Sequence, residues 1–414
     1  MLPHPRFGGV RPLLSYRDVR FALRNRSGWA AVCPVSGEAR AGRNRRHRRR
    51  IMNKPTQPLP LETRHVFLDT QVYRRLHHNV ANPALATLAR HIADRAVVLH
   101  ITDITLLEIR RQIAEDVAAK ARELATIEKS FRRWRHTSKG LPEPTSVDAA
   151  VIAADLFRHF AKAVVEDWAA IVHRAQELPA SAVFADYFAR NPPFDKDGSK
   201  EFPDAFMLKA LEQWCSANGA LLHVVTQDAA MSRAADSSAP LRHIATLEEL
   251  LSRASVQPDV DLEAVADAVV AAPGFDGALE LLVEDIGDEL IFDYRGDLPE
   301  AEIVGQSTGA IEAVTDYSIA WVGTKSVCMI LTVETEILVE VQYEDRSLAM
   351  YDREDDSWFG GETASTELST KVPLELFVEV ELDNFRVITS ELLRTEYTVS
   401  EGYGWPDYDD GVMR

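Results

Sequence analysis

Four acidic side chains of this chain lie where they could take part in metal-assisted chemistry. Asp69 and Asp228 directly follow apolar segments that have the composition of strands, whereas Glu108 and Asp204 lie near the start of expected helices. Carboxylates that are brought together repel one another, and a bound divalent cation relieves that repulsion. An all-oxygen ligand set suits Mg²⁺ or Mn²⁺ rather than Zn²⁺. Such an ion activates water and stabilises charge on a phosphate, so the pattern predicts phosphodiester hydrolysis.

The elements around these acids are those of a parallel α/β sheet. Parallel strands need crossover helices, and ligands bind beyond the carboxyl ends of such strands. We therefore expect the acids that follow strands to point into a crevice rather than into the core. Thr102 and Asp103 are N-cap candidates for the helix that carries Glu108. Pro203 precedes Asp204, and proline is favoured in the first turn of a helix.

Each acid also has a purely structural explanation. Asp69, Asp204 and Asp228 could simply cap the helices that follow them, and Glu108 could be a solvated helix residue. These explanations are compatible with metal binding, because one carboxylate can cap a helix and still present an oxygen to an ion. Glu201 lies one turn before Asp204 and is a weaker candidate, expected beside the pocket rather than on the metal.

In their order and context, the four acids resemble those of PIN-domain ribonucleases, over roughly residues 62 to 250. Thr226-Gln227-Asp228 matches the Thr or Ser that precedes the fourth acid of that family. The resemblance implies a three-layer α/β/α sandwich with a parallel sheet and Mg²⁺- or Mn²⁺-dependent hydrolysis of RNA. It assigns catalysis and metal binding to Asp69, Glu108, Asp204 and Asp228. The long insertion between Glu108 and Asp204 resembles a larger bacterial subgroup that has a C-terminal acidic domain.

A nuclease also needs cations beside its acids, because the phosphate backbone would otherwise be repelled. Basic residues follow the first two acids closely, and Thr226 precedes the fourth. The candidate substrate-binding residues are Arg74, Arg75, Arg110, Arg111 and Thr226. No base-reading element is recognisable in the sequence, so we make no prediction about sequence specificity.

The charge of the chain is divided steeply along its length. The net charge is −18, yet residues 1–51 hold 13 basic and 2 acidic side chains, and residues 258–414 hold 8 basic and 37 acidic ones. We expect three parts: a basic, disordered extension (1–51), a PIN-like nuclease domain (52–257) and an acidic β-rich domain (258–414). The basic run at residues 43–50 could be an RNA-binding arm, a transit peptide or an extension upstream of a start at Met52.

Periodicity gives a coarse map of the elements. We expect one long helix from residue 103 to about 135, a second from 147 to about 177, and a rim of the pocket in the loop 191–198. The apolar stripe of the first long helix is predicted from Leu106, Leu107, Ile113, Val117, Leu124 and Ile127. In the acidic part, a helical piece at 262–270 precedes long alternating strands at 311–322, 327–343 and 374–382. These strands predict an antiparallel α+β domain with one charged face.

The fold class is therefore α/β, a PIN-like three-layer sandwich, plus a C-terminal antiparallel α+β acidic domain. The predicted activity is that of a metal-dependent endoribonuclease with RNA as its partner. The alternatives are a catalytically silent PIN-like module that binds RNA or regulates, and a DNA-directed nuclease. Absence of any apolar run of about 18 residues argues against a membrane span, and three scattered cysteines fit the cytoplasm. Self-association and a basic protein partner for the acidic domain are further hypotheses.

Overall fold

A computed structural model describes residues 58–134, 147–175, 178–195, 201–347, 349–352 and 357–400. The chain divides into two compact units, and each is described by itself. The first unit spans Pro58–Val256, and the described part of the second begins at Gln257. The basic run at 43–50 lies outside the described residues.

The first unit is built on one parallel sheet of five strands in the order β3-β2-β1-β4-β5. The strands are β1 (His65–Leu68), β2 (Val98–Thr102), β3 (Ile171–His173), β4 (Leu222–Val225) and β5 (Leu241–Ile244). Around them lie α2 (Thr70–Arg75), α3 (Pro83–Ala93), α4 (Asp103–Phe131), α5 (Ala149–Ala161), α6 (Ala180–Ala189), α7 (Phe202–Asn218), α8 (Ala229–Ser237) and α9 (Leu247–Ala254). A 3₁₀ turn (Arg132–Trp134) extends α4, and a π-helical turn (Lys162–Asp167) extends α5.

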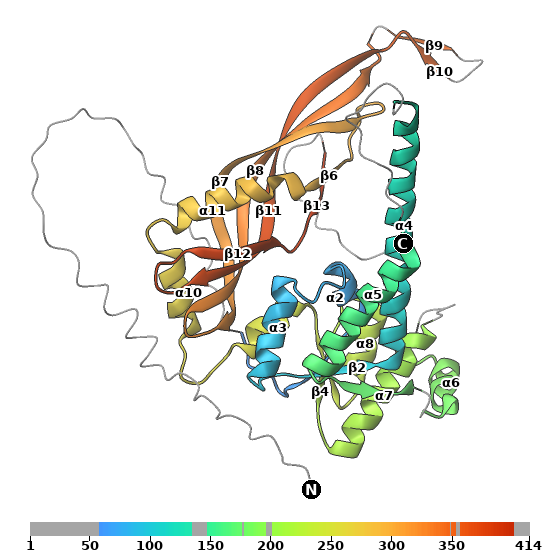
Figure 1. The fold of residues 1–414 in the computed structure, drawn as a ribbon, viewed down its shortest axis with the longest axis vertical. Helices are drawn as coiled ribbons and strands as arrows, with labels where there is room; N and C mark the ends of the chain where they lie inside the picture. The colour runs from blue at the N-terminus through green and yellow to red at the C-terminus, as the bar shows by residue number, and fades with distance from the viewer. Residues whose placement is uncertain are drawn as a thin grey trace, which may run out of the picture. The chain divides into compact units, whose positions relative to one another are not determined.

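Both faces of this sheet are buried, as the apolar runs of its strands require. On one face, Phe67 and Val224 pack with side chains of α7 and α8, among them Leu211 and Met231. On the opposite face, Val66 and Val225 are completely buried. Figure 1 shows α3 and α7 on opposite sides of the sheet. The unit therefore has the three-layer, parallel architecture that the sequence predicts.

Two expectations for the long insertion are wrong in detail. The segment 147–177 is not one helix, because it turns at Ala169, which has a positive φ of 51°, and returns to the sheet as β3. The apolar stripe of α4 is also displaced from the predicted one. Ile113 is buried as predicted, but Leu107 is 62% exposed, and Ile109, which the predicted stripe did not include, is completely buried. The buried residues of α4 lie between Thr105 and Ile113, and Ile127 farther along is 53% exposed, so apolar spacing there does not indicate a core face.

The second unit contains a four-stranded antiparallel sheet in the order β12-β11-β8-β7. Its strands are β7 (Glu302–Val322), β8 (Ser326–Asp345), β11 (Glu362–Glu381) and β12 (Val387–Leu392). The remaining elements are α10 (Leu262–Val270), α11 (Phe275–Ile286), a 3₁₀ turn (Gly287–Glu289), β6 (Ile291–Tyr294), β9 (Met350–Asp352), β10 (Ser357–Phe359) and β13 (Glu396–Val399). The strands β13 and β6 form a separate parallel pair, and β9 pairs with β10.

Alternation along the long strands separates an apolar face from a charged one. Val339 and Val341 on β8 are fully buried, whereas Glu340 between them is exposed. Glu340 lies directly opposite Glu367 on β11, and both are exposed. Like charges opposite each other destabilise a sheet, so the charged face carries an energetic cost. Among the helices in the described ranges, none is long and apolar enough to span a membrane.

Candidate active site

The strand order of the first unit reverses between β1 and β4, and two of the predicted acids follow these two strands. Chain connections run from β1 outward through β2 to β3, and then return to β4 on the other side of β1. In open parallel sheets, ligands bind in the crevice at such a reversal. Asp69 directly follows β1, and its backbone N–H donates to the carbonyl of Val225, the last residue of β4 (3.0 Å). Asp228 lies three residues beyond Val225.

The hydroxyl group of Thr226 connects these two acids. Its Oγ1 donates to Oδ2 of Asp69 (2.7 Å) and accepts a hydrogen bond from the backbone N–H of Asp228 (3.0 Å). Thr226 is completely buried. Contact of Thr226 with substrate stays a prediction, and in this structure its hydroxyl is occupied by the two acids. Its position makes it a residue that orients Asp69 and Asp228.

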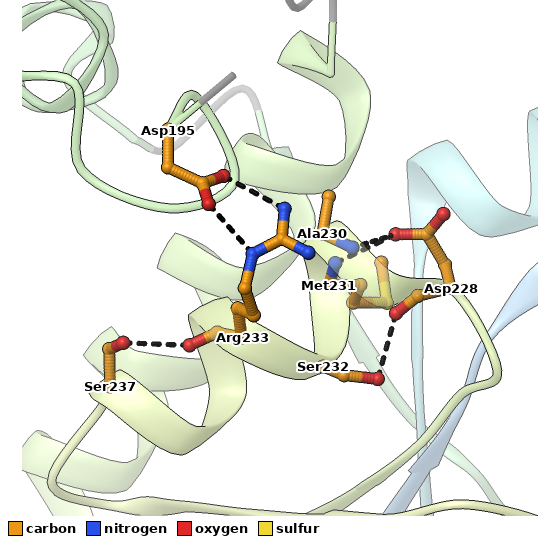
Figure 2. A network of polar contacts seen from close by, with 7 residues as sticks. All are labelled: Asp195, Asp228, Ala230, Met231, Ser232, Arg233 and Ser237. Carbon is orange, nitrogen blue, oxygen red and sulfur yellow. Dashed lines mark hydrogen bonds and ion pairs between the residues drawn. The ribbon is translucent and has the colours of Figure 1, made fainter. Parts of the chain in front are cut away.

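Asp228 caps helix α8, as one of the structural explanations predicted. Its Oδ1 accepts hydrogen bonds from the backbone N–H groups of Ala230 (2.8 Å) and Met231 (2.7 Å). Figure 2 shows that the second carboxylate oxygen points away from these two N–H groups. The cap thus fixes the carboxylate with one oxygen and leaves the other oriented away from the helix. Capping and ligand roles remain compatible in this geometry.

The side chain of Glu108 is held by a hydrogen bond from the first residue of α2. The hydroxyl of Thr70, the residue after Asp69, donates to Oε2 of Glu108 (2.7 Å). This hydrogen bond holds the Glu108 carboxylate near the end of β1. Helix α4, which carries Glu108, begins at an N-cap formed by Thr102, whose Oγ1 accepts the N–H of Thr105 (3.0 Å). Thr102 directly ends β2. The strand end therefore sets the position of Glu108.

Asp204 is the electrostatic centre of the group. It lies in the first turn of α7 and is half-buried. Burial, followed by the negative charges of Asp69, Glu201, Glu108 and Asp228, raises the pKa of Asp204 to about 8. The pKa of Asp69 is also raised, chiefly by burial, although the Thr226 hydrogen bond opposes the shift. The four predicted acids therefore lie close enough to affect one titrating group together.

The chemistry of this donor set fits a hard divalent cation. All of its groups are carboxylates, and their negative charges add to the effect of burial in raising the pKa of Asp204. Within the described part of the chain, however, no three His, Cys, Asp or Glu side chains are gathered tightly enough to hold a metal ion directly. Mg²⁺ commonly binds through one or two carboxylates and retains several waters. The four acids suit that looser mode.

The predicted basic residues lie on the surface and are partly engaged elsewhere. Arg75 forms an ion pair with Glu248 of α9 (2.5 Å), and Arg111 pairs with Glu115 one turn along α4 (3.7 Å). The guanidinium of Arg110 lies 5.9 Å from the centre of the Phe157 ring. Arg74 is exposed on α2. Their roles in substrate binding stay a prediction.

A basic residue that sequence reasoning missed lies beside Asp228. Arg233, one turn into α8, forms a two-point ion pair with Asp195, from Nε to Oδ2 (2.7 Å) and from Nη2 to Oδ1 (3.0 Å) (Figure 2). The charge of Asp228 contributes to raising the pKa of Arg233, which places the guanidinium within electrostatic reach of the acids. Asp195 belongs to the loop that the sequence suggested as a rim of the pocket. No sequence signal connects two residues that are 38 positions apart.

The pKa of Asp204 predicts a pH dependence of stability in the metal-free protein. A carboxyl whose pKa is about 8 in the folded state and 3.8 in the unfolded state keeps its proton up to a higher pH when the protein is folded. Its contribution to stability is thus complete below pH 3.8 and is lost as the pH rises towards 8. We expect Asp204→Asn to remove this loss. Urea unfolding between pH 5 and pH 9 in EDTA checks it, and parallel curves for both proteins would contradict it.

Comparison with known proteins agrees with this geometry. Residues 66–231 match the model of the PIN domain family, a region that begins in β1 and ends in α8. It contains all four acids. PIN domains are generally nucleases and typically depend on a divalent metal. No curated protein and no solved structure gives a significant match to the chain. The first unit of this chain, with its parallel sheet and its acids at the β1/β4 strand ends, is thus a PIN domain.

Proposed function

We propose that the PIN domain is an endoribonuclease that hydrolyses RNA phosphodiester bonds with Mg²⁺ or Mn²⁺ held by Asp69, Glu108, Asp204 and Asp228. The observation that carries the proposal is geometric: Asp69 and Asp228 follow the two strands at the strand-order reversal and are joined by the hydroxyl of Thr226, and the hydroxyl of Thr70 binds Glu108 next to Asp69. The negative charges of these acids contribute, after burial, to the raised pKa of Asp204. Such a concentration of negative charge lowers the free energy of unfolding, so it indicates a functional site at which a bound cation compensates the charge.

Each residue has a distinct part in this proposal. Asp69 and Asp228 are held rigidly by the Thr226 hydroxyl and by the N-cap of α8, respectively. Asp204 and Glu108 complete the oxygen donors from the two flanking helices. When bound, the metal would activate water and stabilise charge on the phosphate. With a pKa of about 8 before metal binding, Asp204 would release its proton as a cation binds.

A catalytically silent PIN module is the main alternative. It would retain the fold without hydrolysis, and it is disfavoured because all four acids are present. A DNA-directed nuclease is the other alternative, and the choice between RNA and DNA is part of the proposal. The acidic second unit would regulate the nuclease or recruit a basic protein, supported by the exposed like-charge pair Glu340 and Glu367.

The test is cleavage of end-labelled oligonucleotides by the full chain. RNA and DNA of the same sequence are compared in Mg²⁺, in Mn²⁺ and in EDTA, each as single strand and as duplex. We expect RNA products in either metal and none in EDTA. Preferential cleavage of DNA would replace the ribonuclease with the DNA-directed alternative. Absence of cleavage of every substrate, with folded protein, would favour the silent module.

A further inference from the structure

A cluster of aromatic rings joins α6 to the start of α7, the helix that carries Asp204, and three of its members are open to solvent. On α6, Phe184 is 46% exposed, Tyr187 is 39% exposed and Phe188 is 79% exposed. Phe184 and Phe188 are four residues apart, so they share one face of the helix, with ring centres 6.4 Å apart. Single exposed apolar residues are ordinary, but three adjacent aromatic rings on one short helix indicate a binding surface.

The inner part of this cluster is fixed to the element that carries Asp204. Phe202, the first residue of α7, contacts Phe184 (5.6 Å between ring centres), Tyr187 (5.1 Å) and Phe194 (5.0 Å). Phe194 is buried with Ala205, the residue that follows Asp204. The exposed rings are therefore rigidly connected to the first turn of α7, two residues from the central acid.

The same cluster is connected to the cation beside the acids. Phe194 contacts Tyr187 (5.3 Å), and the next residue, Asp195, holds the guanidinium of Arg233 at two points. In Figure 2 the third guanidinium nitrogen points away from Asp195 towards the start of α8. Arg233 is thus preorganised, with Nη1 outside the ion pair. The consecutive residues Phe194 and Asp195 thus join the aromatic cluster to the guanidinium of Arg233 on α8.

We propose that the α6 rings and Arg233 form a subsite for single-stranded nucleic acid, in which the rings stack on bases and Arg233 contacts a phosphate. The proposal rests on the nuclease function above and narrows its substrate class. Aromatic side chains can stack only on bases that are not already stacked in a duplex, whereas a basic groove alone would accept either form. Continuity with the acids favours nucleic acid over a protein as the occupant.

Binding of a fluorescent, unstructured 12-nucleotide RNA to the full chain tests the subsite without cleavage. The measurement uses the Asp204→Asn background in EDTA, which stops hydrolysis and removes one repelling charge. We expect Phe184→Leu/Phe188→Leu to weaken binding about tenfold or more, because leucine keeps the apolar area but has no π face. Phe188→Trp should retain affinity. The matched control is Ile152→Ala/Leu156→Ala, which changes two exposed apolar residues of α5.

Arg233→Ala tests the phosphate contact in the same assay. It should weaken binding and reduce the slope of log affinity against log salt by about one. Arg158→Ala is the matched control, because Arg158 also pairs with an aspartate, Asp155 (2.7 Å), on the exposed surface of α5.

The outcomes separate this subsite from the nuclease itself. Wild-type affinity in the leucine variant, or equal loss for single strand and duplex, would overturn the subsite even if the wild-type protein cleaves RNA. Loss of self-association in that variant, with RNA affinity unchanged, would identify a protein interface instead. Ring-dependent binding of single strands by a protein that cleaves nothing would leave the subsite standing and overturn the nuclease.

Discussion

Replacing Asp204 by asparagine is expected to abolish the thermal stabilisation that Mn²⁺ gives to the PIN domain. An ion that binds only the folded state stabilises it by about 2.7 kcal/mol at a hundred times its dissociation constant. For a domain of this size, that shift corresponds to roughly 5–10 °C in Tm. Asp204 interacts with all three other acids, so its loss should affect ion binding more than the loss of a peripheral acid.

The measurement is thermal unfolding with Mn²⁺ and with EDTA. The matched control is Glu115→Gln, an exposed acid two turns beyond Glu108 on α4, which should keep the full Mn²⁺ shift. In EDTA at pH 8 and above, Asp204→Asn should be at least as stable as the wild type, because its neutral side chain is not repelled by the other acids. An equal Mn²⁺ shift in both proteins would contradict the four-acid site.

Thr226→Val is expected to lower both stability and cleavage, although it hardly changes side-chain volume. The valine leaves a buried oxygen of Asp69 without its donor (2.7 Å) and the N–H of Asp228 without its acceptor (3.0 Å). A buried polar group that loses its partner costs about 1–3 kcal/mol. The two acids would also lose the group that orients them.

Urea unfolding and single-turnover cleavage measure the two effects of that substitution. Thr226→Ser retains the hydroxyl and should recover most of both properties. A Thr226→Val protein with wild-type stability and activity would show that the hydroxyl does not organise the site.

The strand ends and caps of the PIN domain were predictable because local chemistry determines them. An apolar run followed by Asp69, and the N-cap at Thr102, are visible in a few consecutive residues. The course of the insertion was not predictable, since β3 becomes a strand only by pairing with β2. In α4, spacing suggested a core face that included Leu107, but the packing of the helix buries Thr105 and Ile109 on either side of it and leaves Leu107 exposed.

The candidate site, too, was predictable from the sequence only in part. Four acids could be named from short motifs, because each motif encodes its own strand end or helix start. Their mutual effect on Asp204, and the role of Thr226 between two acids, depend on segments that are distant in the sequence, since Thr226 and Asp69 are 157 positions apart. The pair of Asp195 and Arg233 has no motif at all. Long-range pairs of this kind are visible only in three dimensions.

Single-turnover cleavage of end-labelled single-stranded RNA in Mn²⁺, with wild type and Asp204→Asn side by side, tests the central claim most directly. The variant should lose several kcal/mol of the stabilisation that the metal gives to the transition state of cleavage. We therefore predict a fall in the cleavage rate of at least about a hundredfold, with the variant still folded. Equal rates in the two proteins, or a wild type that cleaves as well in EDTA as in Mn²⁺, would contradict the acid pocket as the catalytic centre.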